Sequence, residues 1–305
     1  QRGGLIIDDA YHGMTSITND ISPLVETLPE HIKGLTPPDG YRHGDNSEAL
    51  LAQAQQAIDT LKQQGDGLSS WMIDSALCSS GVPEVSNRYF QNMADLVRQN
   101  GGLIIADEVQ SGFGRLGKMW GCEARGFDHE ADIVTLGKPV ANGHPLGVVI
   151  TRREYLNRFI NRTELFSTFG GNPVSCAGGL AVLDEIQQQD LIAHGQRVGD
   201  YFRDQLSRLA AKVSRETSHP NILIGDVRGR GLLIGLEFVT DLDTKAPATE
   251  AVQRLVEMLK ERYILVGREG KGKNIFKMRP NFMLQNCHVD QFVAALADAL
   301  KQLNG

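Results

Sequence analysis

Two charged residues, Asp107 and Lys138, each follow an apolar segment of the chain. Residues 103–106 end directly before Asp107, and residues 133–136 end two positions before Lys138. Neither segment alternates polar and apolar residues, which is typical of a strand buried on both faces of a sheet. In open α/β sheets, ligands bind just beyond the carboxyl ends of such strands. We therefore predict that Asp107 and Lys138 face one site.

A carboxylate and an amine directed at one small site supply the two groups that pyridoxal phosphate chemistry requires. A lysine amine forms a Schiff base with an aldehyde. An aspartate beside a pyridine nitrogen favours the protonated ring, because opposite charge stabilises the ion. The protonated ring then withdraws electrons from a substrate carbanion. Lys138 and Asp107 are thus the candidate catalytic residues.

Five motifs follow one another in order. They are Asp107-Glu108-Val109-Gln110, Gly112-Phe113-Gly114-Arg115, Gly137-Lys138, Asn142-Gly143-His144-Pro145 and Thr168-Phe169-Gly170-Gly171-Asn172-Pro173. Together they resemble the class III aminotransferases, a family of fold type I that uses pyridoxal 5'-phosphate. The match extends from about Tyr11 to the C-terminus, and the stretch from Asn142 to Leu183 is most similar to the ethanolamine-phosphate phospho-lyase-like branch.

The resemblance implies a role for each residue at the two strand ends. Lys138 forms the Schiff base and moves the proton at the substrate carbon, and Asp107 pairs with the ring nitrogen. Val109 packs against the ring, although ordinary core packing explains this valine equally well. Gln110 reaches the phenolic oxygen, and Tyr11 stacks on the opposite face of the ring.

Three further residues join the cofactor-binding set. His12 follows Tyr11 and has a structural rather than a catalytic role. Ser167 and Thr168 precede a helix that Pro173 opens, and a helix N-terminus with nearby hydroxyls is a suitable anion site. By resemblance they reach the cofactor phosphate of the neighbouring subunit, which implies a homodimer with a shared active site. The alternative for this segment is a plain turn and helix cap.

The substrate end departs from the family pattern. Family members that use amino-acid donors carry an arginine near the C-terminus, and its aligned position here is Lys277. The glutamate that masks this arginine falls on about Ser79. Lysine does not reproduce bidentate carboxylate binding. Arg279 shares a strand face with Lys277 and either compensates or binds a phosphate; the alternative for both is a solvated edge strand.

Two activities fit these residues. The first is transfer of an amino group from a primary amine or amino acid to a keto acid through a Lys138 Schiff base. The second is phospho-lyase chemistry on a phosphorylated amine such as O-phosphoethanolamine, which needs cationic groups near the leaving phosphate. An inactive interaction module is a further alternative. A Walker-type ATPase needs a Gly-x-x-x-x-Gly-Lys-Ser/Thr loop, which this sequence does not contain.

Composition limits the partners. The 305 residues carry a net charge of −6 with no basic stripe, which argues against nucleic acid, and no apolar run approaches the roughly 20 residues of a membrane span. The four cysteines are far apart and predict neither a metal site nor a disulfide framework. We expect a cytoplasmic enzyme of small-molecule amines.

The alternation of strands and helices predicts an α/β fold of the fold type I class, with a mostly parallel, doubly wound sheet and a smaller C-terminal α+β domain. We place the large cofactor-binding domain at residues 1–187 and the small domain, with its bridging helix, at 188–305. Because a strand at residues 4–8 already opens the chain, we expect that the N-terminal segment of the family is missing.

The remaining expectations concern single elements. Residues 14–46 are expected to form a long loop, and Ser47 to cap the helix that follows. The glycines at 229–231 are expected to form a turn, with Arg228 near the active-site mouth. The other elements expected are helices at about 173–187 and 190–213 and strands near 71–74, 148–150, 232–239, 264–266 and 275–278.

Overall fold

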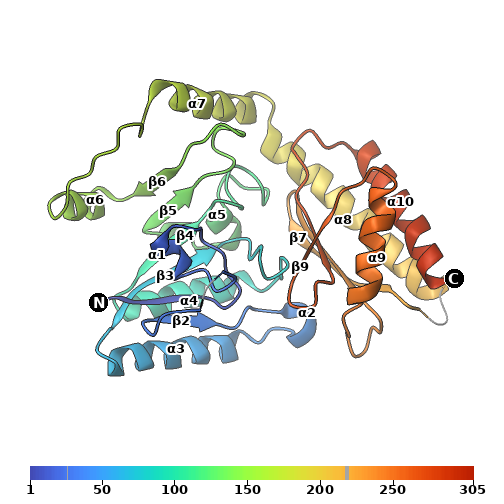
Figure 1. The fold of residues 1–305 in the computed structure, drawn as a ribbon, viewed down its shortest axis with the longest axis horizontal. Coiled ribbons are helices and arrows are strands. Elements are labelled where there is room, and N and C mark those ends of the chain that lie inside the picture. The colour runs from blue at the N-terminus through green and yellow to red at the C-terminus, as the bar shows by residue number, and fades with distance from the viewer. Residues whose placement is uncertain (26, 217–219) are drawn as a thin grey trace.

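The fold is built on two β-sheets, as the computed structural model shows for residues 1–25, 27–216 and 220–305 (Figure 1). The larger sheet has the strand order β2-β1-β3-β4-β5-β6. Strands β1 to β5 run parallel and β6 is antiparallel to β5, which confirms the predicted mostly parallel sheet. The strands are β1 (Gly3–Ile7), β2 (Ile32–Leu35), β3 (Leu68–Asp74), β4 (Leu103–Asp107), β5 (Ile133–Leu136) and β6 (Val148–Thr151).

Helices α3 (Ser47–Gln63) and α4 (Asn87–Gln99) share one buried core with this sheet. Their apolar residues recur every three or four positions, so that one stripe of each helix is removed from water. On α3 the buried residues are Leu50, Ala54, Ile58 and Leu61. The prediction that Ser47 caps α3 is wrong: Asn46 is the N-cap residue and makes no side-chain cap bond, while the Ser47 hydroxyl donates to Asp45.

Residues 14–46 contain more structure than the expected loop. They include α1 (Ser16–Asn19), strand β2 and α2 (Gly40–His43). Strand β2 pairs with β1 at the edge of the large sheet. Its four residues are too few for a clear apolar pattern, and the prolines on either side are more typical of a loop. Pairing with β1, rather than a local sequence pattern, therefore determines that these residues form a strand.

The smaller sheet is antiparallel and has the strand order β7-β8-β10-β9. Its strands are β7 (Leu223–Arg230), β8 (Leu233–Val239), β9 (Gly267–Glu269) and β10 (Ile275–Met278). Helices α8 (Leu191–Glu216), α9 (Thr249–Lys260) and α10 (Asn286–Asn304) share its core. The predicted strand at 264–266 is wrong, because β9 begins at Gly267. Residues 217–219 lie outside the described part.

Strand β7 was not expected, because Gly229 and Gly231 were assigned to a turn. Gly229 instead lies within β7, and Gly231 follows its last residue. Only Gly231 and Leu232 separate β7 from β8. Gly231 has a φ of +50°, and a Cβ there would lie 2.5 Å from the backbone nitrogen of Gly117. Glycine is therefore required at this turn, both for its backbone conformation and for the close approach of residues 115–117. The expectation of a glycine turn is confirmed at Gly231.

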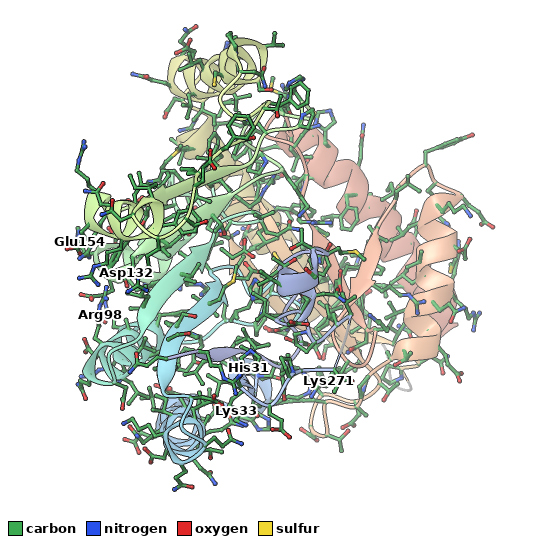
Figure 2. All side chains as sticks on the ribbon, turned by 60° about the vertical axis from the view of Figure 1, so that its left-hand side comes forward. His31, Lys33, Arg98, Asp132, Glu154 and Lys271 are labelled. Atoms are coloured by element: carbon green, nitrogen blue, oxygen red, sulfur yellow. The ribbon has the colours of Figure 1, made fainter. Side chains whose placement is uncertain are left out.

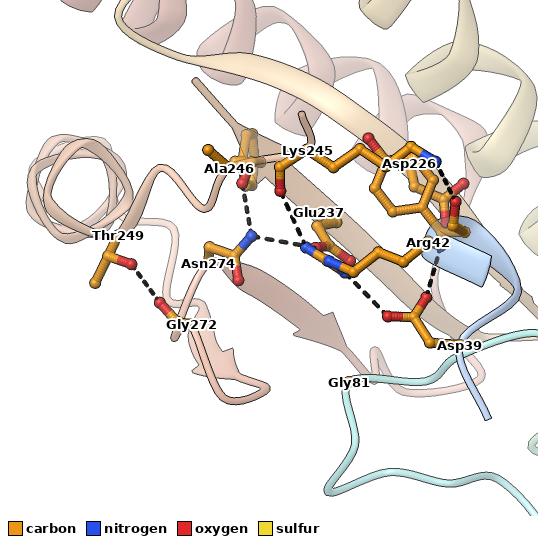
Figure 3. A network of polar contacts seen from close by, with 12 residues as sticks. Asp39, Arg42, Gly81, Asp226, Glu237, Lys245, Ala246, Thr249, Gly272 and Asn274 are labelled. Atoms are coloured by element: carbon orange, nitrogen blue, oxygen red, sulfur yellow. Dashed lines mark hydrogen bonds and ion pairs between the residues drawn. The ribbon is translucent and has the colours of Figure 1, made fainter. Parts of the chain in front are cut away.

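A buried glutamate joins helix α2 (Gly40–His43) to the smaller sheet (Figure 3). Glu237 of β8 has a fully buried side chain and accepts hydrogen bonds from Arg42 of α2, from Arg228 of β7 and from Asn274. Arg42 also pairs with Asp39 at 3.1 Å. The helix that follows β2 is thus fastened to the small sheet by charge-assisted hydrogen bonds.

A second buried carboxylate, Asp132, lies at the amino-terminal ends of strands β4 and β5 (Figure 2). It pairs with Arg98 of α4 at 2.8 Å and accepts from the backbone nitrogen of Ile104 and from the Tyr155 hydroxyl. Tyr155 lies in α6 (Arg153–Ile160), which precedes α7 (Pro173–Gln188). Within the described residues, no helix is both long and apolar enough to span a membrane.

Candidate active site

Asp107 and Lys138 lie at the carboxyl ends of neighbouring parallel strands. Asp107 is the last residue of β4 and pairs in register with Thr135 of β5. Lys138 follows two residues after β5 ends, and its side chain is exposed. Asp107 is only 5 % exposed. Both residues thus lie at the same edge of the sheet, with a buried carboxylate and an exposed amine; that they face one site stays a prediction.

The Asp107 carboxylate is fixed by two hydrogen bonds. Its Oδ2 lies 2.7 Å from Nδ1 of His12, and its Oδ1 accepts from the backbone nitrogen of Val109 at 3.0 Å. Because the carboxylate only accepts, Nδ1 of His12 is the donor. The His12 side chain is fully buried. Two hydrogen bonds leave further lone pairs on the carboxylate for a cationic partner.

A cavity of about 780 Å³ adjoins this strand edge. Four of the predicted site residues line it: Val109, Gln110, Lys138 and Arg279. Arg115, Glu185 and Phe282 also line it. Tyr11, His12, Asp107, Ser167, Thr168 and Lys277 are not among its lining residues. The structure therefore brings together four of the ten predicted residues at the cavity wall. Asp107 and His12 are linked to this wall by the hydrogen bond between Asp107 and the Val109 backbone.

The two predicted substrate residues differ in their surroundings. Nζ of Lys277 lies 2.6 Å from Oε1 of Glu269 on β9, and the lysine side chain is 9 % exposed. Arg279 is exposed, and its Nη1 donates to Oε1 of Gln110 at 2.8 Å. Strand β10 lies between β8 and β9, so the alternative of a solvated edge strand is wrong. Lys277 is neutralised by its own sheet, whereas Arg279 reaches across to the large sheet.

The remaining cofactor-set residues lie away from the cavity wall. Tyr11 is 40 % exposed beyond the end of β1. Ser167 and Thr168 are exposed, in the segment between α6 and α7 that stands apart from the body of the molecule in Figure 1. Ser167 Oγ accepts from the backbone nitrogen of Gly170, and Asn172 caps α7. Within one chain, this segment forms the turn and helix cap of the alternative reading.

Three polar residues near the site, Asp74, Glu108 and Arg115, had no role assigned from the sequence. Asp74 ends β3 in register with Asp107, and the apolar run before it was the signal that could have identified it. Removal from water, and then the charge of Asp107, raise the pKa of Asp74 to about 6. Glu108 is fully buried and accepts from Ser75, Ser111 and the backbone nitrogens of residues 121 and 122. Glu108 therefore has a structural role. Arg115 lines the cavity.

Arg228 does not reach the active-site mouth, contrary to expectation. It is buried and pairs with Asp226 and Glu237 at 2.8 and 2.7 Å. Its Nε and Nη2 donate to backbone carbonyls of residues 81 and 82. Arg228 therefore joins β7 and β8 to the segment between β3 and α4.

The residues present fit pyridoxal 5'-phosphate on its ring side. The cavity volume lies within the roughly 300–1,000 Å³ of small-molecule sites. Lys138 supplies an amine and Val109 an aliphatic side chain at the cavity wall. Asp107, which accepts a hydrogen bond from the Val109 backbone, supplies a buried carboxylate. Nε2 of His12 and Oγ1 of Thr135 are buried without a partner within the described residues. Such atoms gain a partner when a polar ligand binds beside them.

The fold and the arrangement of the site are those of fold type I and of the class III aminotransferase family. The family model for class-III aminotransferases matches residues 3–300, and the chain belongs to this family, whose members depend on pyridoxal phosphate. Among curated proteins it is 36 % identical over 270 residues to an alanine–glyoxylate aminotransferase 2 homolog from Arabidopsis thaliana, covering 87 % of this chain. It spans only 54 % of that relative's length.

Two further relatives bear phospho-lyase names. The chain is 30 % identical over 326 residues to ethanolamine-phosphate phospho-lyase homolog 1 from Caenorhabditis elegans, which covers 99 % of this chain and 68 % of the relative. Among solved structures, a phospholyase from Arthrobacter in complex with phosphoethanolamine superposes with a TM-score of 0.90 and 37 % identity, covering 99 % of this chain and 71 % of that one. The predicted family and fold are confirmed.

Proposed function

We propose that this chain is a pyridoxal phosphate-dependent enzyme that acts on a primary amine, with Lys138 as its central catalytic residue. The observation that carries the proposal is the pairing of β4 with β5, which sets Asp107 and Lys138 at one edge beside the 780 Å³ cavity. When bound, the cofactor withdraws electrons from the substrate carbon that bears the nitrogen. The residue roles below are predictions built on this placement.

Each residue has a task that its position supports. The Lys138 amine holds the cofactor's aldehyde carbon and, once released, moves the proton at the substrate carbon. Asp107, oriented by His12, keeps the ring nitrogen protonated, because a buried carboxylate favours a cation beside it. Val109 lines the cavity and would pack against the ring; Tyr11 lies outside the cavity lining, so its stacking on the opposite ring face rests on the family resemblance alone. Gln110 donates from its amide to the phenolic oxygen.

Transamination and phosphate elimination begin with the same proton transfer and then diverge. In transamination, Lys138 would return the proton at a second carbon, and the cofactor would carry the amino group from the donor to a keto acid. In elimination, the C–O bond on the neighbouring carbon breaks, and phosphate leaves with the electron pair. Transamination is typical of the family at large. The likeness to a phospholyase at 37 % identity supports elimination as the second candidate.

A second copy of the chain would complete the site. Ser167 and Thr168 lie in an exposed segment, and we propose that their hydroxyls bind the cofactor phosphate of a partner subunit. The surrounding surface is unusually apolar: Val149, Phe159, Leu165, Phe166, Phe169 and Val174 are between 52 % and 80 % exposed. Large apolar side chains exposed in this number near one segment support an interaction site there. A homodimer in the cytoplasm is our proposal for this chain.

A spectrum and two incubations test the function. Protein mixed with pyridoxal phosphate should gain an absorbance band near visible wavelengths that Lys138→Ala lacks. Identical spectra for both proteins would refute the cofactor assignment. Incubation with O-phosphoethanolamine, and separately with an amino acid and a keto acid, then separates the activities. Released phosphate and aldehyde indicate elimination, and a new amino acid indicates transamination.

A further inference from the structure

His144 connects the loop that follows Lys138 to helix α7. Its Nε2 lies 2.9 Å from Oγ of Ser175, although 31 positions separate the two residues. Ser175 lies in the first turn of α7 and is only 6 % exposed, whereas His144 is exposed. Oγ of Ser175 also accepts from Nδ2 of Asn172 at 3.0 Å. In the described part of the chain the Ser175 hydroxyl hydrogen has no other acceptor, so this hydroxyl donates to His144.

The loop between Lys138 and His144 has a backbone conformation that needs support. Asn142 has a φ of +45° and Gly143 one of +106°, so two left-handed residues directly precede His144. Glycine adopts this conformation freely, whereas asparagine adopts it at a modest cost. The bonds within the loop are short turns, such as the one from the backbone nitrogen of His144 to the carbonyl oxygen of Ala141 at 3.1 Å. Such a conformation persists where the surrounding structure holds it.

Helix α7 supplies the surrounding structure along one of its faces. A Cβ added to Gly178 would lie 3.6 Å from Cβ of Ala141. A Cβ added to Gly179 would meet Leu146 at 3.1 Å and Val140 at 3.7 Å. Because glycines stand at both positions, the loop approaches the helix more closely than larger side chains would allow. Apolar contact at the middle of α7 and a hydrogen bond at its start thus hold the loop at two places.

The same loop and helix form part of the cavity wall. Lys138 and Asn142 line the cavity beside Val182 and Glu185 of α7. A shift of the loop along the helix would therefore move the Lys138 amine relative to this wall. Reacting groups tolerate little misplacement, because a displacement of about 1 Å can cost on the order of a hundredfold in rate.

We propose that His144 is a positioning residue for Lys138: its hydrogen bond to Ser175 holds the loop on α7 and so places the lysine amine in the cavity. His144 is not among the residues that line the cavity, so it acts through the loop. The competing explanation is that the bond only reinforces the cap of α7, which Asn172 already provides. The inference rests on the proposed function and goes beyond it, since it explains how Lys138 is held.

Hydrogen exchange without the cofactor tests whether the bond holds the loop. We expect His144→Phe to speed amide exchange in residues 138–146 by about fivefold or more and to leave β7 and β8 unchanged. His144→Gln should exchange as the unmodified chain does, because its amide can replace Nε2 as the partner of the Ser175 hydroxyl. His129→Phe is the matched control, since that side chain is 96 % exposed. Equal loop exchange in His144→Phe and the unmodified chain would overturn the proposal.

Titration with pyridoxal phosphate tests whether the loop places Lys138. The absorbance band that depends on Lys138 should require about ten times more cofactor in His144→Phe, and His144→Gln should stay within about threefold of the unmodified chain. Adding His144→Phe to Ser175→Ala should weaken binding no further, because both substitutions remove the same bond. Additive losses, an unchanged affinity in His144→Phe, or a failure of His144→Gln to restore binding would each overturn the role of the bond.

The outcomes separate this inference from the proposed function. A chain that gives no absorbance band refutes the cofactor assignment, whereas the exchange experiment still decides whether His144 holds the loop. Normal cofactor affinity in His144→Phe, together with a lower urea midpoint, would overturn the positioning role and leave the helix cap as the task of the bond. If the His144 variants fail to fold, Ser175→Ala replaces them in the exchange experiment: faster loop exchange supports the proposal, and unchanged exchange overturns it.

Discussion

Arg279 donates from Nη1 to Oε1 of Gln110 at 2.8 Å, and this contact sets the orientation of the glutamine amide. An arginine side chain only donates, so the amide oxygen faces Arg279 and the NH₂ group remains available as a donor. Gln110 follows β4 and Arg279 follows β10. The contact therefore joins the ends of two sheets at the wall of one cavity.

We expect Gln110→Leu to weaken cofactor binding about tenfold, because the variant loses the donor predicted to reach the phenolic oxygen. Titration of the absorbance band with pyridoxal phosphate measures this affinity. Gln91→Leu, on the exposed side of α4, is the matched control and should bind the cofactor normally. An unchanged affinity in Gln110→Leu would show that the amide serves only Arg279.

Asp107→Asn should lower kcat by about a hundredfold or more, because the amide cannot stabilise a protonated ring nitrogen as a carboxylate does. The amide oxygen can still accept from the Val109 backbone or from His12, so the fold should be retained. Steady-state kinetics and the cofactor spectrum measure the effect. Asp95→Asn on the surface of α4 serves as control, and an equal loss of activity there would contradict the proposed role of Asp107.

Asp74 should make the stability of the protein depend on pH. Its pKa is raised from 3.8 to about 6 in the folded state, so its favourable contribution is complete below about pH 3.8 and is lost as the pH rises through 6. In Asp74→Asn the side chain no longer titrates, so the free energy of unfolding no longer falls with pH at this position. Relative to the unmodified chain, we expect the variant's free energy of unfolding to rise between pH 4 and pH 7 by on the order of 2 kcal/mol. Urea unfolding at several pH values measures this difference, and parallel pH profiles would contradict it.

Glu237→Gln should cost about 3 kcal/mol of folding free energy, because Arg42 and Arg228 lose the buried charge that they share. Thermal and urea unfolding measure the loss. Glu257→Gln is the matched control, since its pair with Lys260 is exposed and contributes about 1 kcal/mol or less. Equal effects of the two substitutions would mean that the Glu237 network does not hold α2 to the smaller sheet.

Replacement of Phe166 and Phe169 by serine should separate the proposed dimer, because both side chains are more than 75 % exposed in one chain. Light scattering should give twice the 33.4 kDa chain mass for the unmodified protein and a single chain mass for the variant. Leu265→Ser changes an equally exposed apolar residue outside this surface and should leave the mass unchanged. A monomeric unmodified chain would refute the dimer.

The large sheet and its catalytic edge were predictable because their signals are local. An unbroken apolar run that ends at a charged residue identifies a buried parallel strand and its functional end, as at Asp107. The helices carry apolar stripes, and the start of α7 at Pro173 was predicted to the residue. Strand β2 and strand β7 were not predicted, because pairing with a neighbour rather than an apolar pattern defines them.

The site was predictable where a residue follows a strand, and not where its partner comes from another element. The sequence gives no sign that Lys277 faces Glu269, since that pairing depends on the register of β9 and β10. Arg115 was part of a recognised motif, but its lack of an acidic partner emerges only from the packing of residues 115–117 against 231–232. The division of the chain at residue 187 remains a prediction.

The Lys277–Glu269 pair limits how the proposed substrate end can be redesigned. An engineer who wished to admit α-amino acids would first place an arginine at position 277. That guanidinium would meet Glu269 before it met any substrate, and the two would bind each other. A library that varies both positions together is therefore the shorter route to a new specificity.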